Sequence, residues 1–218
     1  MLIIHHLNES RSQRVIWLAE ELGLPYRIQH HSRGSDYLAP DSLKRLHPLG
    51  KAPLVERDGQ ILAETGFIVE TLARGTDLLA EGPAGDAVRY WLHYAEGSAM
   101  PPLVMKLVLS KVPDSAPRLM RPVARALVAG VNKAYLGREL DRHAAFWEQT
   151  LARSGWFAGD RLTAADVMMS FPVEMAALRG RLADRPATRG WLDRIHARPA
   201  YQRALKAGGA DFSGATAN

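Results

Sequence analysis

The sequence predicts an α/β domain followed by an all-helical domain, and three observations indicate this fold class. Strand and helix signals alternate over the first third of the chain. A segment rich in glycine and proline, residues 75–85, then interrupts them. Beyond this segment the apolar residues follow helical spacing. We therefore expect domains at residues 1–76 and 86–208, a linker at 77–85 and a tail at 209–218.

The chain opens with signals for a strand, a helix and a second strand. Residues 2–4 form a short β-branched-rich run that is typical of a buried strand. A helix is predicted to follow from Ser10, because Ser10 and Gln13 have the spacing of a capping box and Gly23 ends the apolar periodicity. Residues 26–31 have the composition of a second strand. This order within about thirty residues predicts a right-handed crossover between parallel strands.

An irregular segment, a hairpin and a helix complete the first domain. Residues 32–49 have only weak helical character. Asp58 and Gly59 then lie between two apolar runs, which is a strong signal for a two-residue hairpin turn. A further helix is expected to open at residues 64–66. The resulting order, βαβ and then ββα, is that of a thioredoxin-like domain.

The second domain is predicted to contain helices only. One helix start carries a distinct motif, in which Thr163 and Asp166 have the spacing of a capping box. We assign both residues a structural role and expect loss of Asp166 to lower stability by roughly 1–2 kcal/mol or more. The helical segments run at about residues 86–110, 118–151, 164–182 and 187–197, with a short one near 201–206.

Composition excludes several classes of function. The chain of 218 residues is 47% hydrophobic and 23% charged, which suits a globular protein, and no apolar run approaches the roughly 20 residues of a membrane helix. Its start lacks the pattern of a signal peptide, so we expect a cytoplasmic protein with no membrane partner. The net charge is +5, but the basic residues are interleaved with acids, and we expect no nucleic-acid partner. There is no cysteine, so any thiol chemistry needs a thiol from a bound ligand.

Three motifs, spread over most of the chain, carry a resemblance to one known family. The stretch HPLGKAPLVERDGQILAETGFIVETLA, residues 47–73, resembles the glutathione-binding segment of the cytosolic glutathione S-transferase family. LTAAD at 162–166 resembles the capping box of its sixth helix. The opening HHLNESRSQRVIWLAEELGLPY, residues 5–26, is similar to the first strand and helix of serine-type members, theta-like or of a related bacterial or fungal class.

The resemblance implies an enzyme that conjugates reduced glutathione to small hydrophobic electrophiles. It also implies a homodimer that needs no metal and no cofactor besides glutathione as co-substrate. Glutathione-dependent reduction of peroxides or disulfides at the same site is one alternative, and a noncatalytic interaction protein is another. The motif residues Lys51, Pro53, Glu64 and Thr65 argue against the second alternative, because a scaffold needs none of them.

The resemblance also assigns the residues that hold glutathione. Lys51 is expected to pair with the glycyl carboxylate, and a cis bond between Ala52 and Pro53 is expected to turn the backbone of Ala52 toward the peptide. Glu64 and Thr65 are expected at the γ-glutamyl end, where a helix N-terminus can bind a carboxylate. Taken singly, these residues have plainer roles as a solvated charge or a helix cap.

The residue that activates the thiol is expected near the end of the first strand. A free thiol has a pKa near 8.5, so only about 3% is ionised at pH 7. Family members use Tyr, Ser or Cys here, but the chain has no cysteine and its first tyrosine is Tyr26. This leaves Asn8, Ser10, Arg11 and Ser12.

Ser10 is the first candidate, because Arg14 then matches the basic residue common in the first helix of serine-type members. Its hydroxyl has a competing role as the helix cap. Ser12 and Asn8 are the alternatives, and Arg11 is expected to assist electrostatically. The neighbouring His5 and His6 are interpreted as packed or surface residues and not as metal ligands. The electrophile pocket is expected between the domains, and its candidate residues are Tyr90, His93, Tyr94 and Met100.

Overall fold

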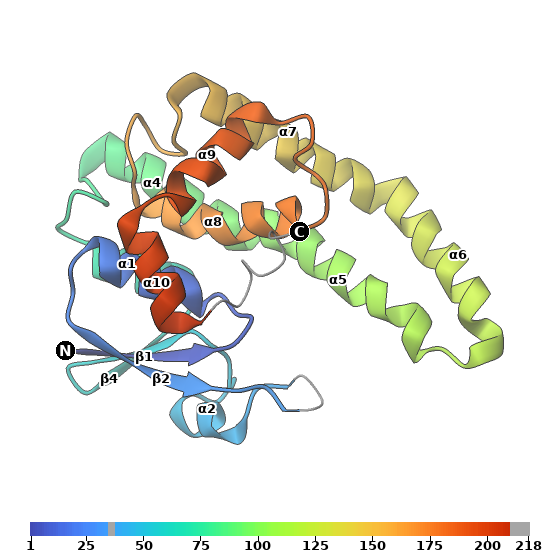
Figure 1. Ribbon diagram of the computed structural model, residues 1–218, viewed down its shortest axis with the longest axis horizontal. Coiled ribbons are helices and arrows are strands. Elements are labelled where there is room, and N and C mark those ends of the chain that lie inside the picture. Colours follow the sequence, from blue (N-terminus) through green and yellow to red (C-terminus); the bar gives the residue numbers. More distant parts are fainter. Residues whose placement is uncertain (35–37, 210–218) are drawn as a thin grey trace.

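The computed structural model describes residues 1–34 and 38–209. Its first domain is built on a sheet of four strands in the order β2-β1-β3-β4 (Figure 1). Strands β1 and β2 are parallel, as predicted from the crossover, whereas β3 runs antiparallel to both β1 and β4. The strands are β1 (Leu2–Leu7), β2 (Tyr26–His31), β3 (Leu54–Arg57) and β4 (Gln60–Ala63).

Helices cover both faces of this sheet. Helices α1 (Ser12–Glu21) and α3 (Thr65–Ala73) pack between the sheet and the second domain, and α2 (Asp41–Leu46) lies on the other face (Figure 1). The first eight residues of α1 are all buried, because the helix contacts the sheet on one side and helices of the second domain on the other. The predicted thioredoxin-like domain is confirmed.

The predicted capping box at the start of α1 is wrong. The helix begins at Ser12 with Arg11 as its N-cap, and no side chain caps it. Among the described residues, neither polar atom of the buried Gln13 amide has a hydrogen-bond partner. The reason is tertiary: Gly208, at the end of the chain's last helix, packs so closely that a Cβ there would lie 2.4 Å from Gln13 Oε1. Gln13 is therefore held against Gly208 and does not reach back to residue 10.

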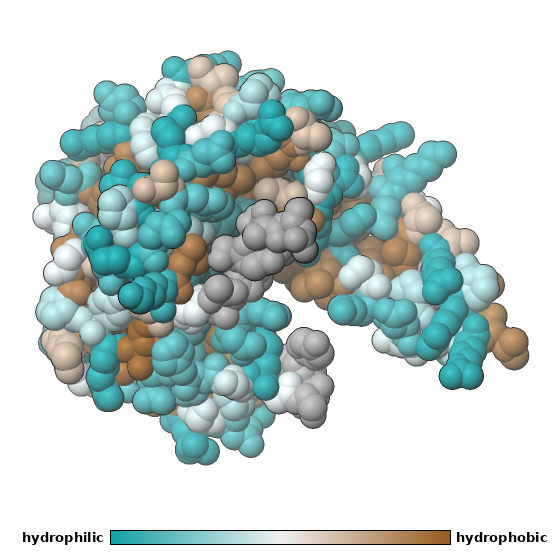
Figure 2. All heavy atoms as spheres, in the orientation of Figure 1, coloured by the Kyte–Doolittle hydropathy of each residue, from teal (hydrophilic) through white to brown (hydrophobic). Residues whose placement is uncertain are grey.

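Helices are the main secondary structure in the described residues of the second domain, which contain no strand beyond an isolated bridge between Trp156 and Gly159. Two long rods run side by side as an antiparallel pair, and their far ends project from the body as an arm (Figure 1). Exposed apolar side chains follow this arm (Figure 2), including Leu107 and Leu127, and Leu119 at its tip. The first rod consists of α4 (Gly82–Tyr94), η1 (Ala95–Ala99) and α5 (Met100–Ser115). The second consists of η2 (Arg118–Met120), α6 (Arg121–Val131), η3 (Asn132–Leu136) and α7 (Gly137–Ser154). The chain then continues with α8 (Ala164–Ala177), α9 (Pro186–His196) and α10 (Pro199–Gly208).

Helix α8 is the centre of the core, and its start confirms the second capping box. Thr163 Oγ1 and the Asp166 carboxylate satisfy backbone groups reciprocally, with Thr163 N–H donating to Asp166 Oδ2 at 2.9 Å. The carboxylate also accepts hydrogen bonds from Phe157 N–H at 3.0 Å and from the Trp191 indole at 2.9 Å. Burial raises the pKa of Asp166 to about 6, although these hydrogen bonds oppose the shift. Asp166 thus connects the start of α8 to the loop that contains Phe157 and to α9, and these contacts support a structural role.

The helices show no candidate for a membrane span. Within residues 1–34 and 38–209, none combines the length and apolar composition that crossing a bilayer requires.

Candidate functional site

A cavity of about 680 Å³ opens between the two domains. It brings together five residues expected at the site: Ser10 and Arg11 from the loop after β1, Lys51 and Ala52 from the loop before β3, and Met100 at the start of α5. A pocket of several hundred cubic ångströms suits a small ligand. The cavity is therefore the candidate active site.

One wall of the cavity is apolar and comes from the second domain. Met100, Leu103, Val104 and Leu107 follow one another along one face of α5, and Phe171 and Met175 add a contribution from α8. Of these residues, only Met100 was predicted from the sequence. The signal for the other three α5 residues was present, because 100, 103, 104 and 107 have the i, i+3, i+4, i+7 spacing of a single helix face. The contribution of α8 depends on the tertiary packing and had no comparable local signal.

The other candidates for the electrophile pocket lie elsewhere. Tyr90, His93 and Tyr94 are not among the described residues that line this cavity. Tyr90 and His93 are exposed on α4. Tyr94 belongs to an aromatic cluster with α7, in which its hydroxyl bonds the His143 ring and accepts a hydrogen bond from Trp147 Nε1 at 3.0 Å. These contacts give Tyr94 a packing role in this structure.

The opposite side of the cavity is basic. Its described lining residues include five cationic side chains and one carboxylate, an imbalance that favours an anionic ligand. Most of the cationic residues come from loops and helix α2 of the first domain, and one follows the C-terminal end of α8. They are Arg11, Arg33, Lys44, Lys51 and Arg179, and the carboxylate is Glu9.

Ser10 and Ser12 are joined directly by a short hydrogen bond. Their hydroxyl oxygens lie 2.7 Å apart, and Ser12 N–H donates to Ser10 Oγ at 3.3 Å. Ser12 Oγ lies 2.8 Å from Nδ1 of His6. Ser12 is fully buried, whereas Ser10 is 7% exposed and lines the cavity. The two serines therefore belong to one series of hydrogen-bonded side chains, a polar chain in which Ser10 is the outer member and Ser12 the inner one.

Asn8 has a different position from the serines. Its side-chain oxygen accepts a hydrogen bond from Arg33 N–H at 3.0 Å, and its carbonyl accepts one from Arg33 Nε at 3.3 Å. Asn8 thus connects the end of β1 to the segment after β2, and it is not among the described residues that line the cavity.

Arg11 and Arg14 share a carboxylate of the second domain. Arg14 is buried, and its guanidinium pairs with Glu96 at 2.5 Å and donates to the Met168 carbonyl at 2.6 Å. Burial lowers the pKa of Arg14, and the pairing with Glu96 opposes this shift. Arg11 lies 3.5 Å from the same carboxylate and is about one-third exposed. Arg14 therefore joins the domains, and Arg11 is the cation that reaches the cavity.

The expected glutathione-binding loop has the anticipated backbone. The Ala52–Pro53 bond is cis, as the resemblance implied. Strands β3 and β4 pair Leu54 with Ala63, so Pro53 and Glu64 adjoin each other at the end of the ladder. Glu64 is exposed and has a φ of 69°, a left-handed conformation that costs a residue other than glycine about 1–3 kcal/mol.

Thr65 completes this end of the site. It is the first residue of α3 and is 6% exposed. Neither it nor Glu64 is among the described lining residues of the cavity, whereas Lys51 and Ala52 are. The predicted binding residues therefore form one continuous edge that begins in the cavity and continues beyond it.

Comparisons with known proteins match the whole two-domain arrangement. The family models for the N-terminal and C-terminal domains of glutathione S-transferase match residues 10–74 and 125–194. Glutathione S-transferase 1 of Saccharomyces cerevisiae is 36% identical, covering 91% of both chains. Glutathione S-transferase 3 of Schizosaccharomyces pombe is 35% identical over 94% of this chain and 87% of its own length. The crystal structure of a glutathione S-transferase from Actinobacillus pleuropneumoniae superposes with a TM-score of 0.80 at 29% identity, covering 98% of this chain and 96% of that one.

Proposed function

Because the chain belongs to the glutathione S-transferase family, we propose that it conjugates reduced glutathione to small hydrophobic electrophiles through a stabilised thiolate. Glutathione conjugation itself follows from the family; the class of electrophile and the thiolate are the proposal. The observation that carries it is the composition of the cavity, which Ser10 lines together with basic side chains and an apolar wall. We propose that the enzyme acts in the cytoplasm as a homodimer.

The basic side suits glutathione, which carries two carboxylates and one ammonium group. In the proposed pose, Lys51 pairs with the glycyl carboxylate and the backbone of Ala52 pairs with the cysteinyl unit, as in peptide addition to a sheet edge. The γ-glutamyl end meets Thr65 and the N-terminus of α3, whose free N–H groups favour a carboxylate, with Glu64 beside it. The adjacency of Pro53 and Glu64 at the end of the β3–β4 ladder supports this pose.

The thiol then lies next to Ser10. Lowering the thiol pKa by about two units requires roughly 2.7 kcal/mol of preferential stabilisation of the thiolate. A hydrogen bond to a charged group contributes about 1.5–3 kcal/mol, so a donated Ser10 hydroxyl supplies a large part of this energy. The guanidinium of Arg11 at the cavity adds a favourable electrostatic interaction.

The apolar wall supports the proposed second substrate. Leu103, Val104 and Leu107 offer a surface without charge, against which a small hydrophobic electrophile can be buried near the thiolate. Burying apolar area gains about 25 cal/mol per Å², so this wall favours apolar over polar electrophiles.

The proposed homodimer is the two-fold arrangement in which the first domain of one subunit packs against the second domain of the other. Exposed aromatic residues on neighbouring helices of the two domains support it: Phe67 of α3 and Tyr90 of α4 are each 53% exposed. An isologous interface of this kind buries the same patch on both subunits.

Ser10→Ala tests the catalytic proposal. The ultraviolet thiolate band of bound glutathione, titrated against pH, should show a thiol pKa about one to two units higher than in the wild type. Conjugation of an aromatic chloride at pH 7 should slow by about ten- to a hundredfold and recover at higher pH, while glutathione affinity changes little. An unchanged titration in Ser10→Ala would refute the role of Ser10.

Two further results bear on the function as a whole. A wild-type protein that is not retained on immobilised glutathione would contradict the binding site. Turnover of an organic peroxide without any conjugation of the aromatic chloride would favour the reductive alternative.

A further inference from the structure

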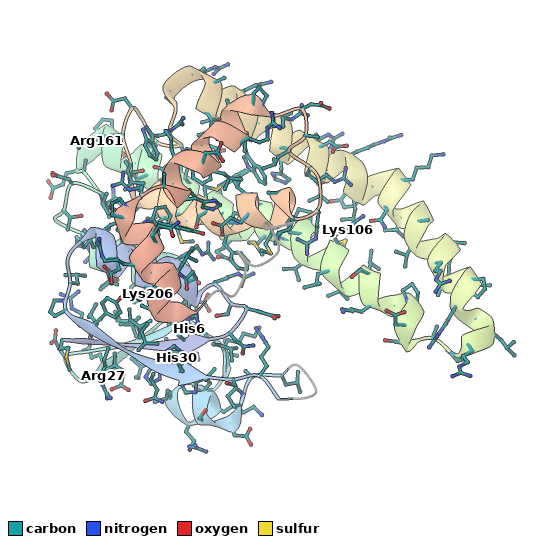
Figure 3. All side chains as sticks on the ribbon, viewed as in Figure 1. His6, Arg27, His30, Lys106, Arg161 and Lys206 are labelled. Carbon is teal, nitrogen blue, oxygen red and sulfur yellow. The ribbon has the colours of Figure 1, made fainter. Side chains whose placement is uncertain are left out.

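The polar chain that begins at Ser10 continues inward to a buried histidine. His6 lies on β1 and is only 1% exposed, with Nδ1 at 2.8 Å from Ser12 Oγ. Its ring packs edge-on against His30 of β2, with the ring centres 5.6 Å apart (Figure 3). The order from the interior to the cavity is therefore His6, Ser12, Ser10.

The direction of the hydrogen bonds along this chain decides whether Ser10 can stabilise a thiolate. Each serine hydroxyl has one hydrogen to donate and two lone pairs to accept. Ser10 Oγ already accepts a hydrogen bond from Ser12 N–H, and Ser12 Oγ accepts one from Leu7 N–H at 3.3 Å. Since the two hydroxyls lie 2.7 Å apart, one of them donates to the other.

If Ser12 donates to Ser10, both lone pairs of Ser10 are occupied and its hydrogen is available to a thiolate in the cavity. Ser12 then has no hydrogen left for His6, so the contact at 2.8 Å requires a hydrogen on His6 Nδ1. If His6 Nδ1 carries no hydrogen, Ser12 donates to it, Ser10 donates to Ser12, and the thiolate loses its donor. The hydrogen on Nδ1 of the buried His6 therefore determines whether the Ser10 hydroxyl can donate to a thiolate.

We propose that His6 is a positioning residue for the thiolate: its Nδ1–H donates to Ser12, which donates to Ser10, which donates to the glutathione sulfur. This inference rests on the proposed function. Hydrogen bonds aligned in one direction polarise one another, so the inner donors strengthen the outermost one.

The His6 ring lies among other histidines of β1 and β2. The ring faces Ser12 on α1 and His30 on β2, and further histidines lie close by on the same two strands. Burial lowers the pKa of His31, and the neighbouring His5, His30 and His6 lower it further. The charged residues that line the cavity beside Ser10 are Glu9, Arg11, Arg33, Lys44, Lys51 and Arg179.

His6→Phe removes the donor and keeps a ring of similar shape. Without a donor at this position, the Ser12 hydroxyl can turn to the Leu7 carbonyl, 3.4 Å away, and release Ser10 from its orientation. We expect the thiol pKa of bound glutathione to rise by about one unit, which is a tenfold loss of thiolate at pH values below the pKa. Ser12→Ala should raise it by a similar amount.

His5→Phe is the matched control. His5 is also buried on β1, but it bonds Glu56 at 2.8 Å and His31 at 3.1 Å and has no hydrogen bond to Ser12 among the described contacts. This variant disturbs the histidine cluster to a similar extent, and the thiol titration should stay at the wild-type value. A titration that shifts equally in His5→Phe and His6→Phe would overturn the proposal, because it would reflect general disturbance of the strand.

Nitrogen NMR of the wild-type protein bound to glutathione gives a second readout that a packing role would not produce. The 15N shift of His6 Nδ1 should be that of a protonated ring nitrogen, and an unprotonated Nδ1 would overturn the proposal even if His6→Phe were unstable. Failure of the underlying function looks different: a wild-type complex without a thiolate band near neutral pH would refute the thiolate mechanism whatever the tautomer of His6.

Discussion

Asp166→Asn is the most direct test of what holds the second domain together. The amide keeps the shape of the carboxylate but replaces one acceptor oxygen with an NH2 group. In the wild type, Oδ1 accepts from Phe157 N–H and Trp191 Nε1–H, and Oδ2 accepts from Thr163 N–H and Thr163 Oγ1–H at 3.1 Å. If the NH2 group replaces Oδ1, both N–H donors lose their acceptor. If it replaces Oδ2, only the Thr163 N–H loses its acceptor, because the Thr163 hydroxyl can turn and accept from the NH2 group.

The cost follows from the burial of these groups. A buried donor without a partner costs about 1–3 kcal/mol, and the amide can adopt the orientation that leaves one such donor. Removing a buried charge offsets part of this cost, because burial disfavours the ionised carboxylate. We expect the free energy of unfolding to fall by about 2 kcal/mol at pH 8, where Asp166 is ionised. For a domain of this size such a loss lowers Tm by roughly 4–8 °C.

The raised pKa of Asp166 sets the sign of the pH dependence. The unfolded carboxyl has a pKa near 3.8 and the folded one about 6, so the folded state binds the proton more tightly. The stability that this residue contributes therefore falls as pH rises from about 4 to about 6. The amide does not titrate, so the difference between wild type and variant should be larger at pH 4 than at pH 8.

Urea unfolding at the two pH values measures this prediction, with Asp160→Asn, an exposed residue of the preceding loop, as the control. Glutathione affinity of the folded fraction should be unchanged. A loss below about 1 kcal/mol at pH 8 would refute the stability argument. Unchanged melting together with a collapse of glutathione binding would make Asp166 a ligand residue.

Two further predictions concern a helix cap and the assembly. Glu148 of α7 caps α9 by accepting hydrogen bonds from Ala187 N–H at 2.8 Å and Thr188 N–H at 2.9 Å. Partial burial raises the pKa of Glu148, but the hydrogen bonds outweigh it and hold the pKa below 4.5. The stability that Glu148 contributes is therefore present above pH 4.5 and is lost as the pH falls through the lowered pKa. Glu148→Gln should therefore cost about 1 kcal/mol at pH 7, and this cost should decrease as the pH falls through the lowered pKa, as measured by denaturant unfolding. Sedimentation at micromolar concentration should show twice the 24.0 kDa chain mass, and a monomer throughout that range would contradict the dimer.

Local patterns in the sequence were sufficient for most of the secondary structure. The strand at 26–31 and the hairpin around Asp58 and Gly59 form where the residues predict them, because these signals act between neighbours in the chain. The box of Thr163 and Asp166 formed for the same reason. The cis bond before Pro53 was expected only from the resemblance to a family.

What the sequence could not decide were contacts between residues far apart in the chain. Ser10 and Gln13 have the spacing of a capping box, but Gly208 packs against Gln13, and the helix begins two residues later. Tyr94 was a candidate for the electrophile pocket, but its side chain packs in an aromatic cluster with α7.

The same distinction applies within the active site. The sequence determined that a serine hydroxyl follows the first strand, because only Ser10 and Ser12 offer one there. Only the tertiary structure determined which serine lies at the cavity. Strand β1 pairs with β2 and packs under α1, which buries His6. The His6 ring contacts Ser12, whereas Ser10 lines the cavity. Local propensity acts over a few residues, whereas the direction of a buried hydrogen-bond chain depends on every group that surrounds it.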